Sequence, residues 1–249
     1  GATVVYSWGD LDKAVRFAFE FSRTHRIIVE EFIETKLPYL IGGDLFIWDG
    51  KVIMWGLMNC HRDSRVNPLV PVGKSYPPQL DEADLQNVKN TLQSMINKLQ
   101  IRSGAMNVEL LIDKKGKVWP IDVGPRNGGN MIPDLLGNIF NTDVVKMTIQ
   151  AAMGTVPEIS LSEPVKYCAT HNLHSQRNGI FAGVKYSDAI KPFIIKECIY
   201  KKPGDPVEYF DNAAKTLGIV FLHFDSEETM KKILEDINSH IEIILQGDI

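Results

Sequence analysis

The sequence has 249 residues, of which 44% are hydrophobic and 23% charged, so its composition is that of an ordinary globular protein with room for one large domain or two small ones. The formal net charge of −4 gives no attraction for nucleic acid or an anionic membrane, and neither is expected as a partner. The three cysteines are widely spaced and form no Cys-x-x-Cys pair, which argues against a disulfide framework and against a structural zinc site. No signal peptide and no long apolar run is recognisable in the sequence. Together these features favour a reducing, cytoplasmic location.

Helix and strand patterns alternate over the first part of the chain. The spacing of apolar and β-branched residues predicts helices over residues 10–24, 81–99 and 143–153 and strands over residues 27–33, 45–48 and 52–57. The dipeptide Asp49-Gly50 is a strong two-residue turn signal that joins the last two strands. The segment 59–78, with basic side chains and four prolines, predicts a loop.

The pattern changes after Pro157 to short strands with two further helices. The predicted elements are strands over residues 165–173, 179–186, 194–200 and 219–224 and helices over residues 209–217 and 226–245. Ser226 is the expected N-cap of the last helix. We therefore expect an α+β domain of residues 1–156, followed by a smaller, β-rich α+β domain of residues 157–249.

The most informative segment is NVELLIDKKGKVWPIDVGPRNGGN, residues 107–130. It predicts a hairpin that is followed by an Arg-Asn-Gly-Gly loop, and the predicted strands are residues 108–113 and 118–123. Asp113 is expected to face Val118 across a turn at Gly116, where glycine is free to adopt positive φ. A constant antiparallel register then places Leu110 opposite Ile121.

The same register places Glu109 opposite Asp122 on one face of the hairpin. Opposed carboxylates repel each other, and a folded protein tolerates them when a cation lies between them or when one is protonated. Two carboxylates together with phosphate oxygens suit Mg²⁺, and Arg126 just beyond the hairpin is in position to meet phosphate charge. The alternative is that both carboxylates are solvated on an ordinary hairpin, or that a slip of one residue separates them.

Other polar residues give weaker signals. Arg62, Arg65 and Lys74 fall in the predicted loop and are candidates for contact with an anionic substrate, with a solvated loop as the alternative. His171 and His174 are three residues apart, but residues three apart on a strand face opposite sides, which argues against a metal site.

The order of these motifs resembles the ATP-grasp superfamily over about residues 3 to 154. The motifs are IIVEEFI, an Asp-Gly hairpin, a long helix, NVELLID and WPIDVGPRNGG, and they look most similar to the carbamoyl-phosphate synthase large chain and related carboxylate–amine ligases. The resemblance implies an α+β fold, with the C-terminal lobe of an ATP-grasp domain, an antiparallel sheet with flanking helices, in residues 1–156. Residues 157–249 look like a lid-type domain.

The resemblance also implies where ATP would bind. The adenine ring would lie against a hinge strand formed by residues 29–33. Glu30 would accept a hydrogen bond from the adenine amino group or lie beside it, and Glu31, Phe32 and Ile33 would offer backbone groups to the ring edge. The alternative is that the two glutamates end a strand in solvent.

At the other end of the nucleotide, Glu109 and Asp122 match the metal-binding acidic pair of the family, which implies Mg²⁺ with Mn²⁺ as an alternative. Arg126 matches the arginine that steadies the transferred phosphate, and is the expected catalytic residue. The segment Asn127-Gly128-Gly129 would let backbone approach that phosphate closely.

Three departures from the family pattern stand out. Gly124 occupies the position, two residues after the second metal carboxylate, where the family usually has asparagine. A ribose-binding glutamate is missing from residues 35–43, with Glu34 and Asp44 as possible substitutes. The N-terminal half of the nucleotide cleft, with its lysine and glycine-rich loop, would precede Ala2, in the same native chain or in a partner subunit.

The implied activity is that of an ADP-forming ligase. Mg-ATP would phosphorylate a carboxylate to an acyl-phosphate, and an amine or related nucleophile would then displace phosphate, so that the protein mainly positions groups and neutralises charge. The expected partners are a small carboxylate, an amine and the missing cleft half, and this chain alone is expected to be inactive. One alternative is a non-catalytic ATP-grasp subunit that completes a partner. Another is an unrelated α+β protein with a chance hairpin.

Overall fold

The computed structural model describes residues 1–159 and 162–247, and strands dominate it. The helices are α1 (Leu11–Phe21), α2 (Glu82–Leu99), α3 (Ile132–Phe140), α4 (Val144–Ala152), α5 (Glu227–Glu235) and α6 (Ile237–His240). Single 3-10 turns are η1 (Trp8–Asp10), η2 (Lys191–Phe193) and η3 (Ala213–Lys215). The strands are β1 (Leu40–Trp48), β2 (Lys51–Arg62), β3 (Pro71–Tyr76), β4 (Gly104–Ile112), β5 (Val118–Gly124), β6 (Cys168–Leu173), β7 (Gly179–Tyr186), β8 (Ile194–Ile199), β9 (Pro206–Val207), β10 (Gly218–His223) and β11 (Ile241–Leu245).

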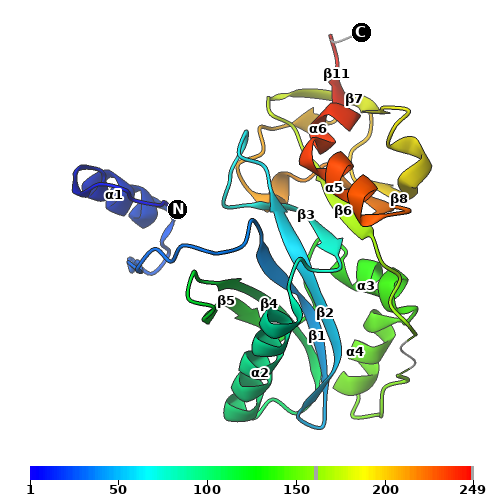
Figure 1. Ribbon diagram of the computed structural model, residues 1–249. Coiled ribbons are helices and arrows are strands. Elements are labelled where there is room, and N and C mark those ends of the chain that lie inside the picture. Colours follow the sequence, from blue (N-terminus) through cyan, green and yellow to red (C-terminus); the bar gives the residue numbers. More distant parts are fainter. Residues whose placement is uncertain (160–161, 248–249) are drawn as a thin grey trace.

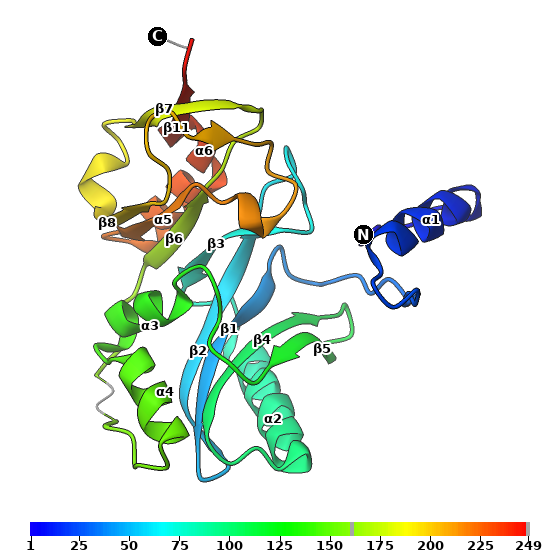
Figure 2. The same ribbon diagram turned by 180° about the vertical axis from the view of Figure 1, so that it is seen from behind.

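One eight-stranded antiparallel sheet organises the molecule, in the order β5-β4-β1-β2-β3-β6-β10-β8. A second sheet has the order β11-β7-β9. Its strands β7 and β11 lie at the end of the molecule away from α2 and α4 (Figures 1 and 2). The expected antiparallel sheet with flanking helices is therefore confirmed.

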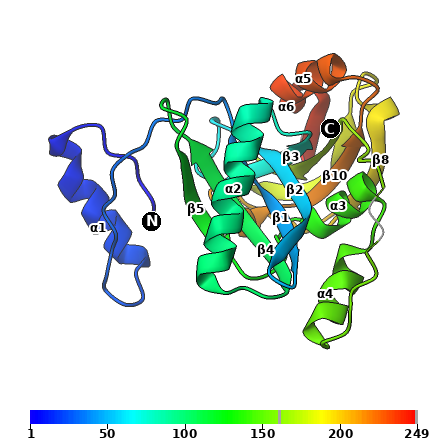
Figure 3. The ribbon, with the colours of Figure 1, turned by 60° about the horizontal axis from the view of Figure 1, so that its bottom comes forward.

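The helices cover the two faces of the large sheet because alternate strand residues point to opposite sides. Val88, Leu92 and Ile96 of α2 pack on one face with odd-numbered residues of β1 such as Leu45. Helices α3 and α4 cover the opposite face, where Phe46 is fully buried. Figure 3 shows α2 on one side of β1 and β2, with α3 and α4 beyond their other side.

Local signals in the sequence are confirmed where caps and turns decide the backbone. Asp49 and Gly50 both have positive φ and join β1 to β2. The side chain of Asp81 accepts from the Asp84 N–H and caps α2. Asp143 caps α4 in the same way, and Gly154 beyond its end has a φ of +73°.

Two expectations for the first part of the chain are wrong. Residues 27–33 form no strand and pair with none of the described strands, because only Thr35 beyond them makes an isolated bridge, to Asp113. The segment 59–78 is not a loop throughout, because β2 runs to Arg62 and β3 pairs with it. Proline is tolerated there because Pro71 begins the strand.

The C-terminal elements also differ from expectation in part. Ser226 caps α5 as predicted, since its hydroxyl accepts from the Thr229 N–H. The predicted helix over residues 226–245 is wrong beyond α6, where β11 pairs with β7. The predicted helix over residues 209–217 is reduced to the 3-10 turn η3, and α3 was not predicted.

The large sheet crosses the predicted domain boundary at residue 156, because β3 pairs with β6 through four residue pairs from Gly73↔His171 to Tyr76↔Cys168. Side chains from both sides of that boundary therefore meet on one surface. The lid-type character of residues 157–249 stays a prediction. Among the described residues, no helix is both long enough and apolar enough to cross a membrane.

Candidate functional site

Glu109 and Asp122 are directly opposed across β4 and β5, as the sequence predicts. The count from the turn was wrong by one residue, since Val118 faces Ile112 rather than Asp113 and Leu110 faces Pro120 rather than Ile121. The register of the two strands shifts by one residue between Glu109 and Leu110, and this shift brings Glu109 back opposite Asp122. Such a bulge adds one residue to one strand and re-aims the side chains beyond it.

The opposed carboxylates line a cavity of about 180 Å³ on the face of the sheet that α3 covers. Other polar residues of its lining are Lys74, Asn107, Arg126, Asn130, Thr170 and Asn172. On β3, Lys74 is paired with Cys60 of β2 on one side and with Thr170 of β6 on the other. The cavity therefore spans the sheet from its β5 edge to β6.

Glu109 already has a cationic partner in this structure. Arg62 donates a hydrogen bond to its carboxylate, and both side chains are about four-fifths buried. The candidate anion-binding residue Arg65 instead contacts Asp63, at 3.0 Å between Nε and Oδ1. The described residues contain no group of three or more His, Cys, Asp and Glu side chains arranged to hold a metal. A metal here would therefore need ligand oxygens from a substrate besides the two carboxylates.

The loop that follows β5 is anchored by a buried carboxylate. Asp44, with no exposed surface, accepts from the Gly128 N–H at 2.8 and 3.0 Å and from Asn107 Nδ2 at 2.8 Å. Burial raises the pKa of Asp44 above its ordinary value, although these hydrogen bonds oppose the shift. A Cβ on Gly128 would lie 2.7 Å from Asn107 Nδ2 and 2.8 Å from Asp44 Oδ1, so only glycine fits.

The Asp44 carboxylate therefore holds this loop in place through its hydrogen bonds. The sequence alone could not predict this role. Asn127, expected near the phosphate, turns its amide to Thr148 of α4, at 3.0 Å. Arg126 is exposed at the cavity, and its guanidinium passes close to Gly124, where a Cβ would lie 3.3 Å from Arg126 Cζ. The glycine at position 124 thus leaves room for this arginine.

Lys74 was missed as part of the carboxylate site, because its strand was predicted to be a loop. Its ammonium group lies 2.6 Å from the Cys60 Sγ atom. Burial raises the pKa of the Cys60 thiol, although the charge of Lys74 opposes the shift. The cavity thus holds two cationic side chains, Lys74 and Arg126, beside two anionic ones.

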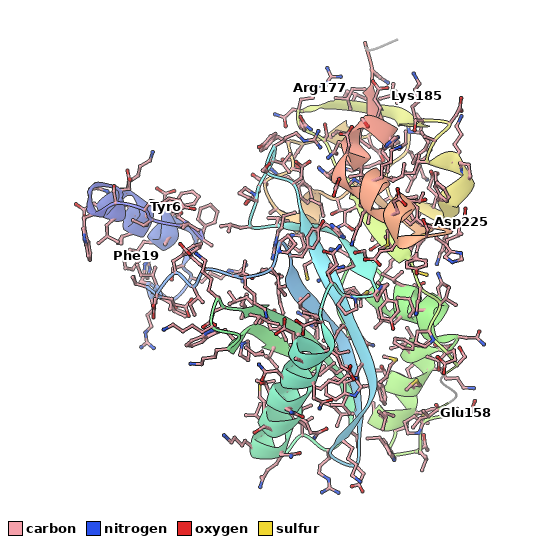
Figure 4. All side chains as sticks on the ribbon, viewed as in Figure 1. Tyr6, Phe19, Glu158, Arg177, Lys185 and Asp225 are labelled. Atoms are coloured by element: carbon pink, nitrogen blue, oxygen red, sulfur yellow. The ribbon has the colours of Figure 1, made fainter. Side chains whose placement is uncertain are left out.

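The predicted adenine-binding residues lie apart from this cavity. Glu30, Glu31, Phe32 and Ile33 are in an irregular segment, and none of them lines the cavity. Phe32 is 59% exposed, and Glu34 forms an exposed ion pair with Lys114. Figure 4 shows Tyr6 and Phe19 of the same N-terminal region extending away from the sheets. The assignment of these four residues to adenine stays a prediction.

A second polar cluster joins β2, β6 and α6. Asp63 accepts from His174 Nε2 at 3.0 Å and from Asn238 Nδ2 at 3.2 Å, in addition to Arg65. Burial by itself would raise the pKa of Asp63, but the hydrogen bonds from His174 and Arg65 hold it below its ordinary value. The rings of His171 and His174 are 5.3 Å apart, so the expectation of opposite sides is wrong, because β6 ends at Leu173. This cluster ties together parts of the chain that are far apart in the sequence.

Comparisons with known proteins show which other proteins have a similar sequence or fold. No family model matches the chain. An uncharacterized protein, y4rH, of Sinorhizobium fredii (strain NBRC 101917 / NGR234) is 24% identical over 172 residues, which are 66% of this chain and 35% of that protein.

Solved structures match over almost the whole chain. Phosphoribosylglycinamide synthetase from Anaerococcus prevotii has a TM-score of 0.74 at 21% identity, covering 99% of this chain and 63% of that one. L-amino acid ligase from Bacillus licheniformis has a TM-score of 0.81 at 19% identity, covering 99% and 62%. The biotin carboxylase domain of 2-oxoglutarate carboxylase from Hydrogenobacter thermophilus, solved with MgADP and bicarbonate, has a TM-score of 0.71 at 16% identity, covering 95% and 52%.

Identities of 16 to 21% to these three proteins show a likeness of fold alone. The chain spans 35% of the curated relative and at most 63% of these three structures. This chain therefore shares its fold with a large part of each of these three proteins.

Proposed function

We propose that this chain is part of an ADP-forming ATP-grasp ligase, which activates a carboxylate with Mg-ATP and joins it to an amine or related nucleophile. The observation that carries the proposal is the meeting of the opposed carboxylates Glu109 and Asp122 with Arg126 in one cavity. The shared fold supports the same reaction class. A relationship to the carbamoyl-phosphate synthase large chain rests on the motifs alone.

The residues of the cavity fit a magnesium–phosphate group. Glu109 and Asp122 would hold Mg²⁺, or Mn²⁺ in its place, because hard cations prefer carboxylate oxygens. Binding would exchange the ion pair between Glu109 and Arg62 for a bond to the metal. Bound Mg-ATP would supply the phosphoryl group that activates the carboxylate.

The protein's own contribution would be charge and position. Arg126 and Lys74 would neutralise charge on the transferred phosphate and on the carboxylate substrate. Asp44 would hold the Gly128 backbone N–H in a fixed place from which the loop supports Arg126. Glu30 to Ile33 would meet the adenine only after their segment packs on a further part of the cleft.

The N-terminal region supports the proposal of such a further part. Trp8 is 90% exposed, Ile28 82% and Val29 73%, and no residue of α1 is buried. Apolar side chains gathered at one end of a chain are typical of a surface that another domain or subunit covers. Immunoblotting of the native polypeptide would separate a longer chain from a separate subunit, because this one has a mass of 28.0 kDa.

A non-catalytic subunit is the second candidate, and the ion pair between Arg62 and Glu109 favours it, because it already satisfies one metal ligand. The other carboxylate of the pair, Asp122, is nevertheless exposed to solvent, where a metal could reach it. Turnover by the native polypeptide without any partner would remove this candidate.

The test is the release of ADP that depends on a carboxylate substrate, measured with the native polypeptide and any subunit that copurifies with it. Asp122→Ala should lower this rate about 100-fold or more, since it removes a ligand that acts on developing charge. Glu228→Ala, which removes an exposed carboxylate on α5 outside the cavity, is the matched control. Circular dichroism would establish that both variants fold. Near-normal turnover in Asp122→Ala would refute the metal assignment.

A further inference from the structure

The end of the cavity opposite the carboxylate hairpin is formed by strand β6. Thr170 and Asn172 point to the same face of that strand because they are two residues apart. Both line the cavity, although they are only 3% and 1% exposed. Neither residue is accounted for by the metal and phosphate roles proposed above.

Asn172 carries an unsatisfied hydrogen-bond acceptor. Its Oδ1 atom is buried and has no partner among the described residues. Its Nδ2 atom donates to the Pro71 carbonyl at 3.3 Å. Exchanging the two amide atoms would set an oxygen against that carbonyl, so the hydrogen-bond network fixes the unsatisfied atom as the acceptor. A buried acceptor without a partner costs about 1–3 kcal/mol, which a ligand with a matching donor would recover.

Thr170 adds a second polar side chain to the same end of the cavity, which its residue lines although it is almost fully buried. Lys74, paired with Thr170 across β3 and β6, supplies a positive charge at the same end of the cavity. A cation there disfavours a ligand that is itself an ammonium ion, but it does not oppose a neutral amine.

We infer that Asn172 and Thr170 form the binding site for the amine substrate, and that this substrate is a small primary amine bound in its neutral form. The two side-chain oxygens would accept its two N–H bonds and leave the nitrogen lone pair free for attack. This inference rests on the proposed ligase function. The cavity volume of about 180 Å³ limits the part of the amine that enters it to a few heavy atoms.

The reaction balances with the groups in the cavity. The amine nitrogen forms a bond to the acyl carbon as the bond from that carbon to the phosphate oxygen breaks. Phosphate leaves with the bonding electrons and takes up the proton that the amine loses. Asn172 and Thr170 are thus positioning residues for the nucleophile, since they hold it in line with the reacting carbon.

Binding to this chain can be measured without ATP. Glycinamide is the probe and glycolamide, which has a hydroxyl group in place of the amine, is its matched control. At mildly alkaline pH, the side-chain amide signal of Asn172 in a ¹⁵N-labelled chain should shift saturably with glycinamide and respond about tenfold more weakly to glycolamide. Equal responses to the two probes would overturn the inference.

Variants separate a binding role from a structural one. Asn172→Leu should fold and lose affinity for glycinamide about tenfold, because it removes the buried acceptor. Thr170→Val should show a smaller loss and serves if Asn172→Leu does not fold. Cys168→Ala, buried on the same face of β6 but outside the cavity, should leave the affinity unchanged. Wild-type affinity in Asn172→Leu and in Thr170→Val would overturn the inference.

Kinetics distinguish this inference from the ligase proposal itself. In the complete enzyme, Asn172→Leu should raise the KM for the amine about tenfold more than the KM for the carboxylate. A uniform loss in both constants would contradict an amine site. If the wild-type enzyme releases no ADP with any carboxylate, the ligase proposal fails, and the glycinamide titration still decides whether the amine site exists.

Discussion

The hairpin of β4 and β5 and the N-terminal segment of residues 1–34 give similar local signals but differ in the structure. Both contain alternating or amphipathic apolar residues. The hairpin pairs with β1, and Val108 and Leu110 are almost completely buried. In the N-terminal segment, Val29 and Phe32 stay largely exposed, and residues 27–33 pair with no described strand. A local pattern therefore becomes a strand only where a neighbouring strand satisfies its backbone.

The largest expected effect comes from a substitution in the loop that follows the β4–β5 hairpin and that Asp44 anchors. Gly128→Ala should lower the free energy of unfolding by about 3 kcal/mol, because a Cβ there would press on Asp44 and Asn107 and break the hydrogen bonds of the loop. Gly129→Ala is the matched control, since no atom lies within 4 Å of its added Cβ. Urea unfolding measures both variants. Equal losses would mean that the close packing of Gly128 is not the cause.

The next effect compares how stability responds to pH at a partly buried histidine, His61, and at an exposed one, His25. Burial, with a smaller contribution from the charge of Lys74, lowers the pKa of His61 from 6.5 to about 4, and burial also lowers the pKa of His171. Because the unfolded chain binds a proton at higher pH than the folded one, this stability is complete above about pH 6.5 and is lost as the pH falls toward 4. His61 should account for a loss of roughly 3 kcal/mol over that range.

Urea unfolding from pH 7 to pH 4 tests this expectation. His61→Gln should flatten the pH dependence, whereas His25→Gln, in the exposed N-terminal segment, should leave it unchanged. An unchanged slope in His61→Gln would contradict the burial argument. Asp63 acts at lower pH, because its lowered pKa gives stability that is present above its ordinary pKa near 3.8 and lost below it.

The smallest effect concerns the N-terminal segment itself. Deleting residues 1–34 should change the free energy of unfolding by no more than about 0.5 kcal/mol, because the segment buries little surface and its ion pair from Glu34 to Lys114 is exposed. Hydrogen exchange of residues 27–33 in the intact chain should be fast, and slow in β4. A loss of several kcal/mol on deletion would mean that the segment packs on the sheet in solution.

Much of the fold could be predicted from the sequence, and so could the pairing of the two carboxylates. The opposition of Glu109 and Asp122 was predicted by counting from the turn, although the count began one residue out of register and the bulge corrected it. Residues 27–33, which include the residues proposed to meet adenine, were predicted to form a strand, and this prediction is wrong. The proposed amine site could not be predicted, because Thr170 comes to lie opposite Lys74 only through the pairing of β3 with β6.

The sequence by itself determined the features that depend on a few consecutive residues. Asp49-Gly50 turns the chain, and Asp81 and Ser226 begin helices, because φ preferences and capping hydrogen bonds act within one turn. Only the tertiary structure decided which strands are neighbours, that Asp44 anchors Gly128, and which exposed surfaces lack a partner. These depend on backbone groups far apart in the chain finding one another, and no local preference encodes that pairing.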